Sequence, residues 1–272
     1  MKTVLITGTS SGIGRAAAAR LARRPDLTVY ATARKTAAIE DLAATGAQML
    51  PLDVTDEASM TAAVAEIERR HGQVDVLVNN AGYGEYGPIE EADIDRVRRQ
   101  FETNVFGLAR LTQLVLPGMR RAGRGRIVNI SSMGGRLVFP GGGYYHASKY
   151  AVEAISDALR QEVRPFGIEV SIVEPGLIRT GFGAVAGESL GANPSGPYRG
   201  LVAAVDRAMT KSYANPALAA TPDAVAKVIE RAVTARRPHT RYIVTGAARA
   251  LVHTRRLLGG RAFDAINRVQ FR

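Results

Sequence analysis

The chain has 272 residues, no cysteine and a formal net charge of +11. This length is enough for one large α/β domain with a sizeable core, and the absence of cysteine excludes a disulfide framework and a thiolate metal site. The arginines are scattered without interleaved aromatic residues, and tryptophan is absent, so we expect no nucleic-acid binding despite the charge. The four histidines (positions 71, 146, 239 and 253) do not cluster, so we expect no metal site.

Short apolar runs alternate with helical stretches, which predicts an α/β, doubly wound, mainly parallel seven-stranded sheet with helices on both faces. The predicted strands lie near residues 3–7, 28–33, 47–52, 74–79, 126–131, 168–173 and 241–245. The predicted helices lie near residues 13–24, 57–71, 92–102, 104–121, 145–164, 199–213 and 222–236. We expect a single domain over residues 1–246, with a Gly- and Pro-rich substrate lid at 181–221, and a basic amphipathic C-terminal helical extension at 247–272.

The first predicted strand leads directly into a glycine-rich turn and then into an alanine-rich helix. This is the context of a dinucleotide-binding turn, although an ordinary βα turn is the alternative. Gly8 permits the tight turn, Gly12 lets the backbone approach a pyrophosphate, and Gly14 allows close helix–strand packing. The phosphates would meet free N–H groups at the positive end of the helix dipole. The segment therefore predicts a Rossmann-type nucleotide site.

Tyr145 and Lys149 stand four residues apart on a predicted helix, so they share one face. A free tyrosine has a pKa of about 10, which is too high for proton transfer at neutral pH. A nearby positive charge favours the phenolate and lowers that pKa. We therefore predict that Lys149 lowers the pKa of Tyr145 and makes it a general acid or base. Accidental spacing on a solvated helix is the alternative.

Six motifs in this order resemble the short-chain dehydrogenase/reductase family of the single-domain type. They are Gly8-x-x-x-Gly12-x-Gly14, Asn79-Asn80-Ala81-Gly82, Asn104, Ser132, Tyr145-x-x-x-Lys149, and Pro175-Gly176 with Thr180. The match covers residues 2 to about 181. The stretch 29–34 and the long C-terminus resemble the branch that contains 17β-hydroxysteroid and retinol dehydrogenases. The resemblance implies an NAD(P)-dependent enzyme acting on CH–OH groups.

The resemblance also implies the catalytic residues. The family's serine lies 13 positions before the tyrosine, which selects Ser132 and leaves Ser131 as structural. Ser132 and Tyr145 would bind the substrate oxygen, and Lys149 would also hold the nicotinamide ribose. Asn104 would hold a water near Lys149.

Cofactor contacts are implied by the same resemblance. Asp53 would read the adenine beside the Val54 backbone, and Asn79 would tie neighbouring strands together. The full set of implied cofactor residues is Gly8, Ser10, Ser11, Gly12, Ile13, Gly14, Arg34, Asp53, Val54, Asn80, Ala81, Gly82, Tyr145, Lys149, Pro175, Gly176, Ile178 and Thr180.

The end of the second strand predicts a preference for NADP(H) over NAD(H). Ala33 stands where an acid would bind the ribose hydroxyls of NAD, and Arg34 follows at once. Arg15 could add further positive charge. Ser11, however, stands where the family's NADP enzymes often carry a basic residue.

The substrate predicted from the sequence is a small hydrophobic ketone, aldehyde or alcohol. The lid region after Thr180, including Asn193-Pro194-Ser195, is rich in glycine and proline, and its side chains are mainly apolar, as are residues 137–140. Phe182 would lie near the entrance, either contacting substrate or anchoring the lid. A 3-oxoacyl carrier-protein reductase is a second enzyme hypothesis, and a non-catalytic NADP(H)-sensing regulator is a hypothesis of a different class.

The C-terminal segment carries arginines and apolar residues in alternation, which is compatible with a membrane surface. Such tails more often cap a core or pack on a neighbouring subunit, and we expect that here. The resemblance implies a homodimer or homotetramer formed through the helices near 104–121 and 145–164. A strand directly after Met1 leaves no room for a signal peptide, so we expect a cytoplasmic protein.

Overall fold

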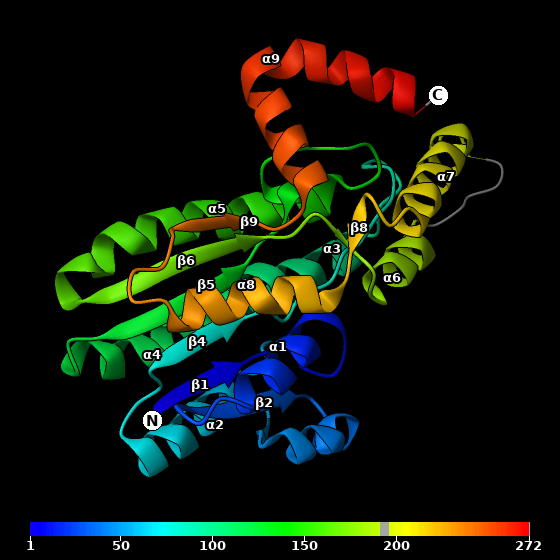
Figure 1. Cartoon of the computed structure of the whole chain (residues 1–272). Coiled ribbons are helices and arrows are strands. Elements are labelled where there is room, and N and C mark those ends of the chain that lie inside the picture. The colour runs from blue at the N-terminus through cyan, green and yellow to red at the C-terminus, as the bar shows by residue number, and fades with distance from the viewer. Residues whose placement is uncertain (191–195, 272) are drawn as a thin grey trace.

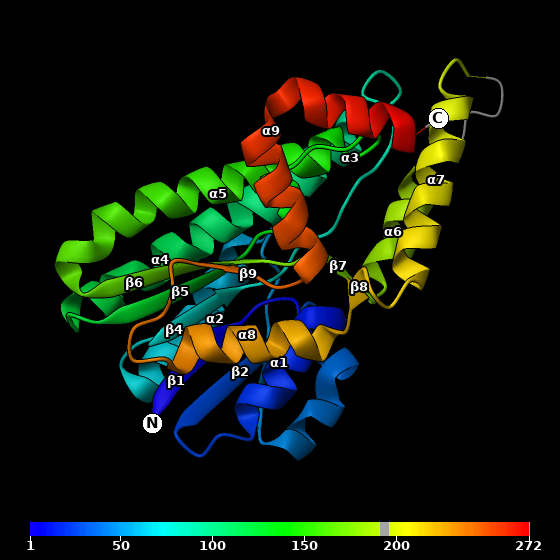
Figure 2. The same ribbon diagram turned by 45° about the horizontal axis from the view of Figure 1, so that its top comes forward.

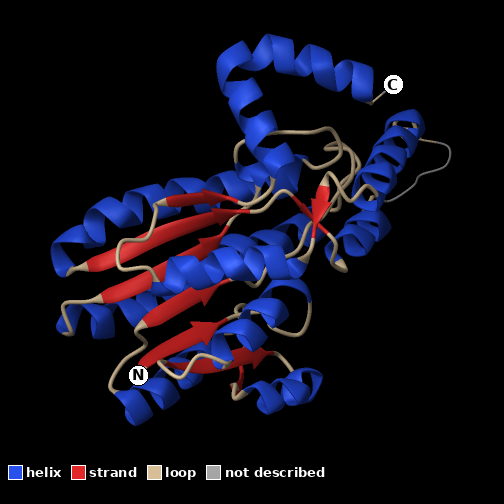
Figure 3. Ribbon diagram, viewed as in Figure 1, coloured by secondary structure: helices blue, strands red, loops and turns tan. Residues whose placement is uncertain are grey.

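A central seven-stranded sheet is covered by helices on both faces in this computed structural model, which describes residues 1–190 and 196–271 (Figures 1 and 3). The strand order is β3-β2-β1-β4-β5-β6-β9, and every neighbouring pair is parallel. The strands are β1 (Lys2–Ile6), β2 (Leu27–Ala33), β3 (Gln48–Pro51), β4 (Val76–Asn79), β5 (Gly125–Ile130), β6 (Ile168–Glu174) and β9 (Arg241–Ile243). The predicted Rossmann-type sheet is confirmed.

The strand order reverses at β1. Val4 of β1 lies opposite Val29 of β2 on one side and Val76 of β4 on the other. The chain therefore runs outward in one direction through β2 and β3, and in the other direction through β4, β5 and β6. Such a reversal of strand order at the carboxyl edge of an open α/β sheet is the kind of place where ligands bind.

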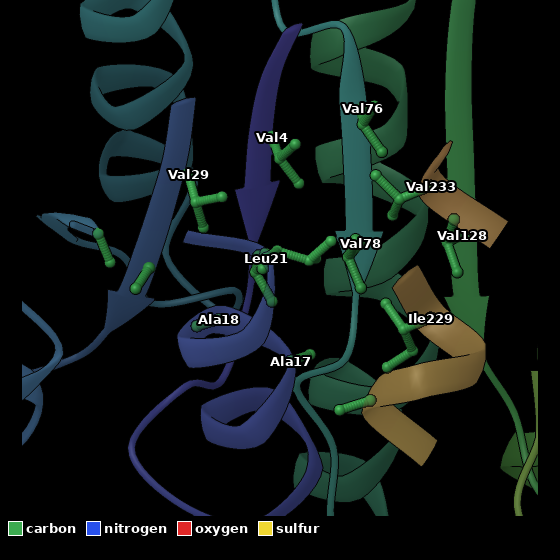
Figure 4. Packing of buried hydrophobic residues seen from close by; sticks show 14 of the residues in the cluster. Val4, Ala17, Ala18, Leu21, Val29, Val76, Val78, Val128, Ile229 and Val233 are labelled. Carbon is green, nitrogen blue, oxygen red and sulfur yellow. The ribbon is translucent and has the colours of Figure 1, made fainter. Parts of the chain in front are cut away.

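One face of the sheet is covered by α1 (Gly12–Ala22) and α8 (Pro222–Thr234). Alternate strand residues such as Val4 and Val78 point to this face, where they pack against Leu21 and Ile229 (Figure 4). α1 is alanine-rich, which favours a helix and lets it approach the sheet and α8 closely. The side chains of Val4, Val78, Leu21 and Ile229 are all buried.

The opposite face is covered by α2 (Glu57–His71), α4 (Leu108–Arg121) and α5 (Gly143–Val163). Leu5 of β1 points to this side and packs in a core with residues of all three helices. α2 begins where the Asp56 carboxylate accepts bonds from the amides of Ala58 and Ser59, at 2.9 and 3.4 Å. It ends at Gly72, whose φ is +84°.

The predicted helices 92–102 and 104–121 form one continuous rod. α3 (Ile94–Phe101) passes through the π-helical turn η2 (Glu102–Gly107) into α4. The π turn contains Asn104, and such turns are frequent at functional sites. Gly107 ends the turn against Val54, where an added Cβ would meet the Val54 carbonyl oxygen at 2.3 Å.

The predicted lid contains the helix expected near residues 199–213 and a second, shorter helix that was not expected. It contains α6 (Phe182–Ser189) and α7 (Arg199–Ala214), while residues 191–195 lie outside the described part of the chain. Five further short elements were not predicted because their periodic patterns are too short. They are the 3₁₀ helices η1 (Thr36–Thr45), η3 (Met133–Gly135) and η4 (Arg164–Phe166), and the strands β7 (Leu177–Ile178) and β8 (Ala219–Ala220), which pair in parallel with each other.

The C-terminal extension is the helix α9 (Gly246–Gln270), which starts at a Thr245 cap and bends at Gly259. It rises from the carboxyl edge of the sheet, and after the bend it runs toward α7 (Figures 1 and 2). Two residues of this helix, Val252 and Phe263, pack against Leu137 in a small buried cluster. In the described part of the chain, no helix combines the length and apolar character needed to cross a membrane.

Candidate active site

The glycine turn after β1 lies directly against the turn after β4. The amide of Asn80 donates to the carbonyl oxygens of Thr7 and Gly8, at 2.9 and 3.0 Å. Gly8 and Gly12 have φ of +68° and +57°, which strongly favours glycine. An added Cβ on Gly14 would lie 2.3 Å from the Asn80 amide nitrogen, and one on Gly12 would lie 3.2 Å from Thr180. The structure thus brings together the predicted Gly8–Gly14, Asn80 and Thr180 segments.

This turn leaves the N-terminus of α1 open to a cavity. Ser11 occupies the cap position, but its side chain makes no capping bond, and the first helical turn holds no acidic residue. The amides at this end and the helix dipole therefore favour an anion. An uncapped helix N-terminus beside glycines with no room for a side chain fits a dinucleotide pyrophosphate.

The predicted adenosine end of the site also lies on this cavity. Ala33, Arg34, Asp53 and Val54 line the same cavity as the glycine turn. The Arg34 side chain is exposed, while the Asp53 carboxylate accepts bonds from the Thr55 amide and hydroxyl at 2.9 and 2.8 Å. Arg15, by contrast, forms an ion pair with Asp41, so its charge is already compensated.

Asn79 and Asn104 are both held by hydrogen bonds within the protein. The Asn79 amide donates to Thr112 at 3.0 Å and to Asn129 at 2.9 Å, and so links β4, α4 and β5. This supports its expected structural role. The Asn104 amide accepts from the backbone N–H of Tyr83 and donates to the Tyr83 carbonyl and to Ser148, all within 2.8–3.0 Å. Every polar atom of the Asn104 side chain is therefore used within the protein.

Tyr145 is buried between two aromatic rings that the motif analysis did not pair with it. Its ring stacks on Tyr86, with centroids 5.6 Å apart, and packs against Phe182 at 5.3 Å. Burial raises the pKa of Tyr145 to about 12, and a hydrogen bond with Ser132 offsets part of that rise. In the chain alone the net change is therefore opposite to the predicted lowering, because burial dominates and Ser132, not Lys149, is the group that lowers the pKa of Tyr145.

Lys149 points to the same region but is held by the backbone. Its ammonium group donates to the Ile130 carbonyl at 3.0 Å, and an added Cβ on Gly82 would lie 3.5 Å from the nitrogen. Burial lowers the pKa of Lys149 to about 8, while the carboxylate of Glu153, one turn further along α5, opposes that change. Gly82, Asn104 and Lys149 thus meet at one point, as the motifs predicted.

A partly buried ionic network holds the part of α5 that follows Lys149. Arg241 of β9 forms ion pairs with Glu153 and Asp157 of α5, and with Glu174 at the end of β6, 2.6 Å away. Glu174 is fully buried and also contacts Arg136 at 3.3 Å. The network links the strand edge of the sheet to the helix that carries Tyr145 and Lys149. Sequence motifs did not reveal it, because its members lie far apart in the chain.

A single cavity of about 1260 Å³ joins the glycine turn to an apolar chamber above Tyr145. All the predicted catalytic residues except Asn104 line it, and Asn104 lies directly behind Gly82. The chamber is lined mainly by side chains that no motif identified: Tyr86, Phe139, His146, Val205, Met209, Tyr213, Leu251 and Phe271. They come from loops, from α5 and α7 and from the C-terminus, so only folding brings them together.

The family assignment follows from comparison with known proteins. The family model described as short chain dehydrogenase matches residues 2–190. The chain belongs to the short-chain dehydrogenase family. Among solved structures, a short-chain dehydrogenase from Streptomyces avermitilis superposes with a TM-score of 0.82 at 38% identity, covering 98% of this chain and 99% of the other. One from Burkholderia phymatum, in complex with NAD, gives 0.79 at 27% identity, covering 94% and 93%. The predicted family is thus confirmed, and the protein is an oxidoreductase.

Two curated relatives are reductases by name. The 3-ketodihydrosphingosine reductase of Bacteroides thetaiotaomicron is 46% identical over 179 residues, which is 66% of this chain and 65% of that protein, just under two thirds of its length. The NADPH-dependent 3-dehydrocapnine reductase of Ornithobacterium rhinotracheale is 36% identical over 255 residues, covering 90% of this chain and 88% of the relative.

His146 makes the stability of this short-chain dehydrogenase depend on pH. Its Nδ1 lies 3.0 Å from the Gly134 carbonyl oxygen, which can only accept, so Nδ1 carries the proton. Burial lowers the pKa of His146 to about 4, from 6.5 when unfolded. Between these two pKa values the folded state therefore binds fewer protons than the unfolded state. The free energy of unfolding has its full value above pH 6.5, where His146 is neutral in both states, and it decreases as the pH falls toward 4.

We expect His146→Asn, whose amide can still donate to Gly134, to remove this pH dependence. The wild type should lose up to about 3 kcal/mol of unfolding free energy between pH 6.5 and pH 4 through this one group. Urea unfolding across that range measures the slope, and His253→Asn, at an exposed position, is the matched control. Equal slopes in wild type and His146→Asn would contradict the assignment.

Proposed function

We propose that this protein is an NADPH-dependent reductase of a long-chain or otherwise bulky apolar ketone, with Tyr145 as the proton donor. The observation that carries the proposal is the continuous cavity, which has the open helix end of α1 at one side and an apolar chamber at the other. Ser132 and Tyr145 line the same cavity, and the Tyr145 ring contacts Tyr86 and Phe182 in its aromatic part. This arrangement suits a nucleotide at the N-terminus of α1 and an apolar substrate in the chamber, with the reacting carbonyl at the Tyr145 phenol.

The roles of the catalytic residues follow from this arrangement. The nicotinamide, when bound, supplies the hydride. The hydroxyls of Ser132 and Tyr145 hold the substrate oxygen, and Tyr145 gives it a proton as negative charge develops there. With its pKa raised to about 12 by burial, the Tyr145 phenol carries its proton at neutral pH and can donate it to the substrate oxygen. Lys149, held by Ile130 next to Gly82, is placed for the ribose hydroxyls.

The cofactor preference is proposed from the second strand's end. Arg34 is exposed and lines the cavity, and Ala33 offers no carboxylate that would repel a 2′-phosphate. The NADPH dependence of the Ornithobacterium relative supports the proposal, while the NAD complex of the Burkholderia structure shows that the family accepts both cofactors.

The substrate class is proposed from the chamber and from the relatives. Phe139, Val205, Leu251 and Phe271 present apolar surface on several sides of the chamber, which suits an alkyl chain. 3-Ketodihydrosphingosine, named in the Bacteroides relative, is a long-chain ketone of this kind. NADPH oxidation with a panel of ketones of constant head group and growing alkyl chain tests the proposal. No turnover of any long-chain ketone would reject it.

Tyr145→Phe should remove the proton donor and leave the nucleotide site intact. We expect kcat to fall by roughly 10²–10⁴-fold. NADPH affinity, measured by fluorescence titration, should change little. Tyr144→Phe, one residue earlier on the same helix and outside the cavity lining, is the matched control and should keep normal turnover. Near-wild-type activity of Tyr145→Phe would remove Tyr145 from the mechanism.

Arg34→Ala should weaken NADPH far more than NADH. A charge-assisted contact with a phosphate contributes about 1.5–3 kcal/mol, or roughly 10- to 150-fold in affinity. Binding constants for both cofactors measure the effect, and Arg23→Ala, exposed at the end of α1, is the control. An equal loss for both cofactors would show that Arg34 does not read the 2′-phosphate.

Phe182→Ala should separate substrate binding from lid anchoring. The ring lies against Tyr145 in the cavity wall, so its loss should raise KM for a bulky ketone more than for a small one, with thermal stability nearly unchanged. Phe166→Ala, at a half-exposed ring far from the cavity, is the control. A uniform loss for all ketones together with a lower Tm would assign Phe182 to anchoring instead.

A further inference from the structure

The distal half of α9 has one face that is buried and one that is not. Phe263 is 2% exposed in the cluster under the helix, and Asn267 donates to the Val138 carbonyl at 3.2 Å. Ile266 and Val269 lie away from this inner face at helical spacing and are 43% and 73% exposed. An apolar stripe therefore faces outward, where no described residue covers it.

Two leucines are exposed at the bend of α9. Leu257 and Leu258 are 81% and 56% exposed immediately before Gly259, whose φ of +74° breaks the helix. The bend protrudes from the body of the molecule in both ribbon views (Figures 1 and 2). Four large apolar side chains are thus exposed within 13 residues of one helix, a grouping that marks an interaction surface in a water-exposed protein.

The charge of α9 indicates which partner fits. The helix holds one acidic residue, Asp264, against five arginines at positions 249, 255, 256, 261 and 268. Within residues 1–190 and 196–271, none of these five forms an ion pair, whereas arginines of the sheet-covering helices, such as Arg110 with Glu57, commonly do. A two-fold interface would set this positive surface against its own copy. Charge complementarity favours an anionic partner.

We propose that the outer surface of α9 docks on an anionic lipid bilayer. Leu257 and Leu258 would enter the headgroup region at the bend, and Arg256, Arg261 and Arg268 would lie near the lipid phosphates. Leu251 and Phe271 of the same C-terminal segment line the catalytic cavity. Docking therefore places the apolar chamber beside the bilayer. Only the corollary that an apolar ketone enters from the lipid rests on the proposed function.

Vesicle co-sedimentation of the full chain tests the docking without any turnover assay. We expect binding to phosphatidylcholine vesicles that contain phosphatidylglycerol and much weaker binding to pure phosphatidylcholine vesicles. Binding should fall as salt is raised, because surface charges are screened. No binding of the wild type to anionic vesicles overturns the proposal, whatever the enzyme reduces.

Matched variants locate the surface. Each arginine near an anionic bilayer strengthens partitioning by roughly fivefold, so Arg256→Gln with Arg261→Gln should weaken it about 25-fold. Arg236→Gln with Arg237→Gln removes the same charge from the loop before β9 and should change it little. The two exposed leucines at the bend are tested in the same way. Leu257→Ser with Leu258→Ser should weaken binding to anionic vesicles even at low salt, whereas Ile94→Ser, at an exposed site on α3, should not. For either pair, a loss of binding equal to that of its control overturns the assignment to α9.

Light scattering on the same proteins distinguishes a lipid bilayer from a second copy of the chain as the partner of α9. If α9 instead meets a second copy, the leucine pair of substitutions lowers the oligomeric mass and vesicle binding is absent, and this overturns the proposal. Unchanged mass with lost vesicle binding supports it. Thermal unfolding confirms that each variant is folded, and the arginine pair, being exposed, carries the test if the leucine pair is unstable.

Discussion

The turns after β1 and β4 touch so closely that side chains have no room between them. A Cβ on Gly14 would meet Gly8 and Asn80 at 2.3 Å, and one on Gly8 would meet Ala81 at 2.8 Å. The contact exists because β1 and β4 are neighbours in the sheet, although 72 positions separate Gly8 from Asn80. It holds the glycine turn at the N-terminus of α1 against the turn that carries Asn80 and Ala81, and both turns line the cavity that Tyr145 also lines.

Burial decides the chemistry at Tyr145. The rings of Tyr86 and Phe182 remove its phenol from water, and that raises its pKa, while the same burial lowers the pKa of Lys149. Both changes favour the neutral forms, as expected when charges are moved out of water. The buried network of Glu153 and Arg241 keeps α5 fixed to the edge of the sheet despite the desolvation cost of its charges.

The C-terminal helix α9 has an inner side that packs on the protein and an outer side that is exposed. Its inner residues complete the chamber wall and pack over residues 137–139, while its outer residues combine leucines with unpaired arginines. In the described chain this division follows from the bend at Gly259, which lets the distal half turn back toward α7. A straight helix would leave the cavity open and carry Phe271 away from Val205.

Local pattern was enough to predict the seven strands, the glycine turn and the helix that carries Tyr145 and Lys149. Each of these depends on residues close in the chain: β-branched runs, positive-φ glycines and side chains four apart on a helix. The pattern was not enough for the continuous α3–α4 rod, since a π turn has no clear periodicity, nor for the short helix α6 of the lid. The pKa of Tyr145 was predicted in the wrong direction because Tyr86 and Phe182 are distant in sequence. The chamber and the outer face of α9 likewise exist only after folding, because burial is a property of tertiary neighbours and not of residue order.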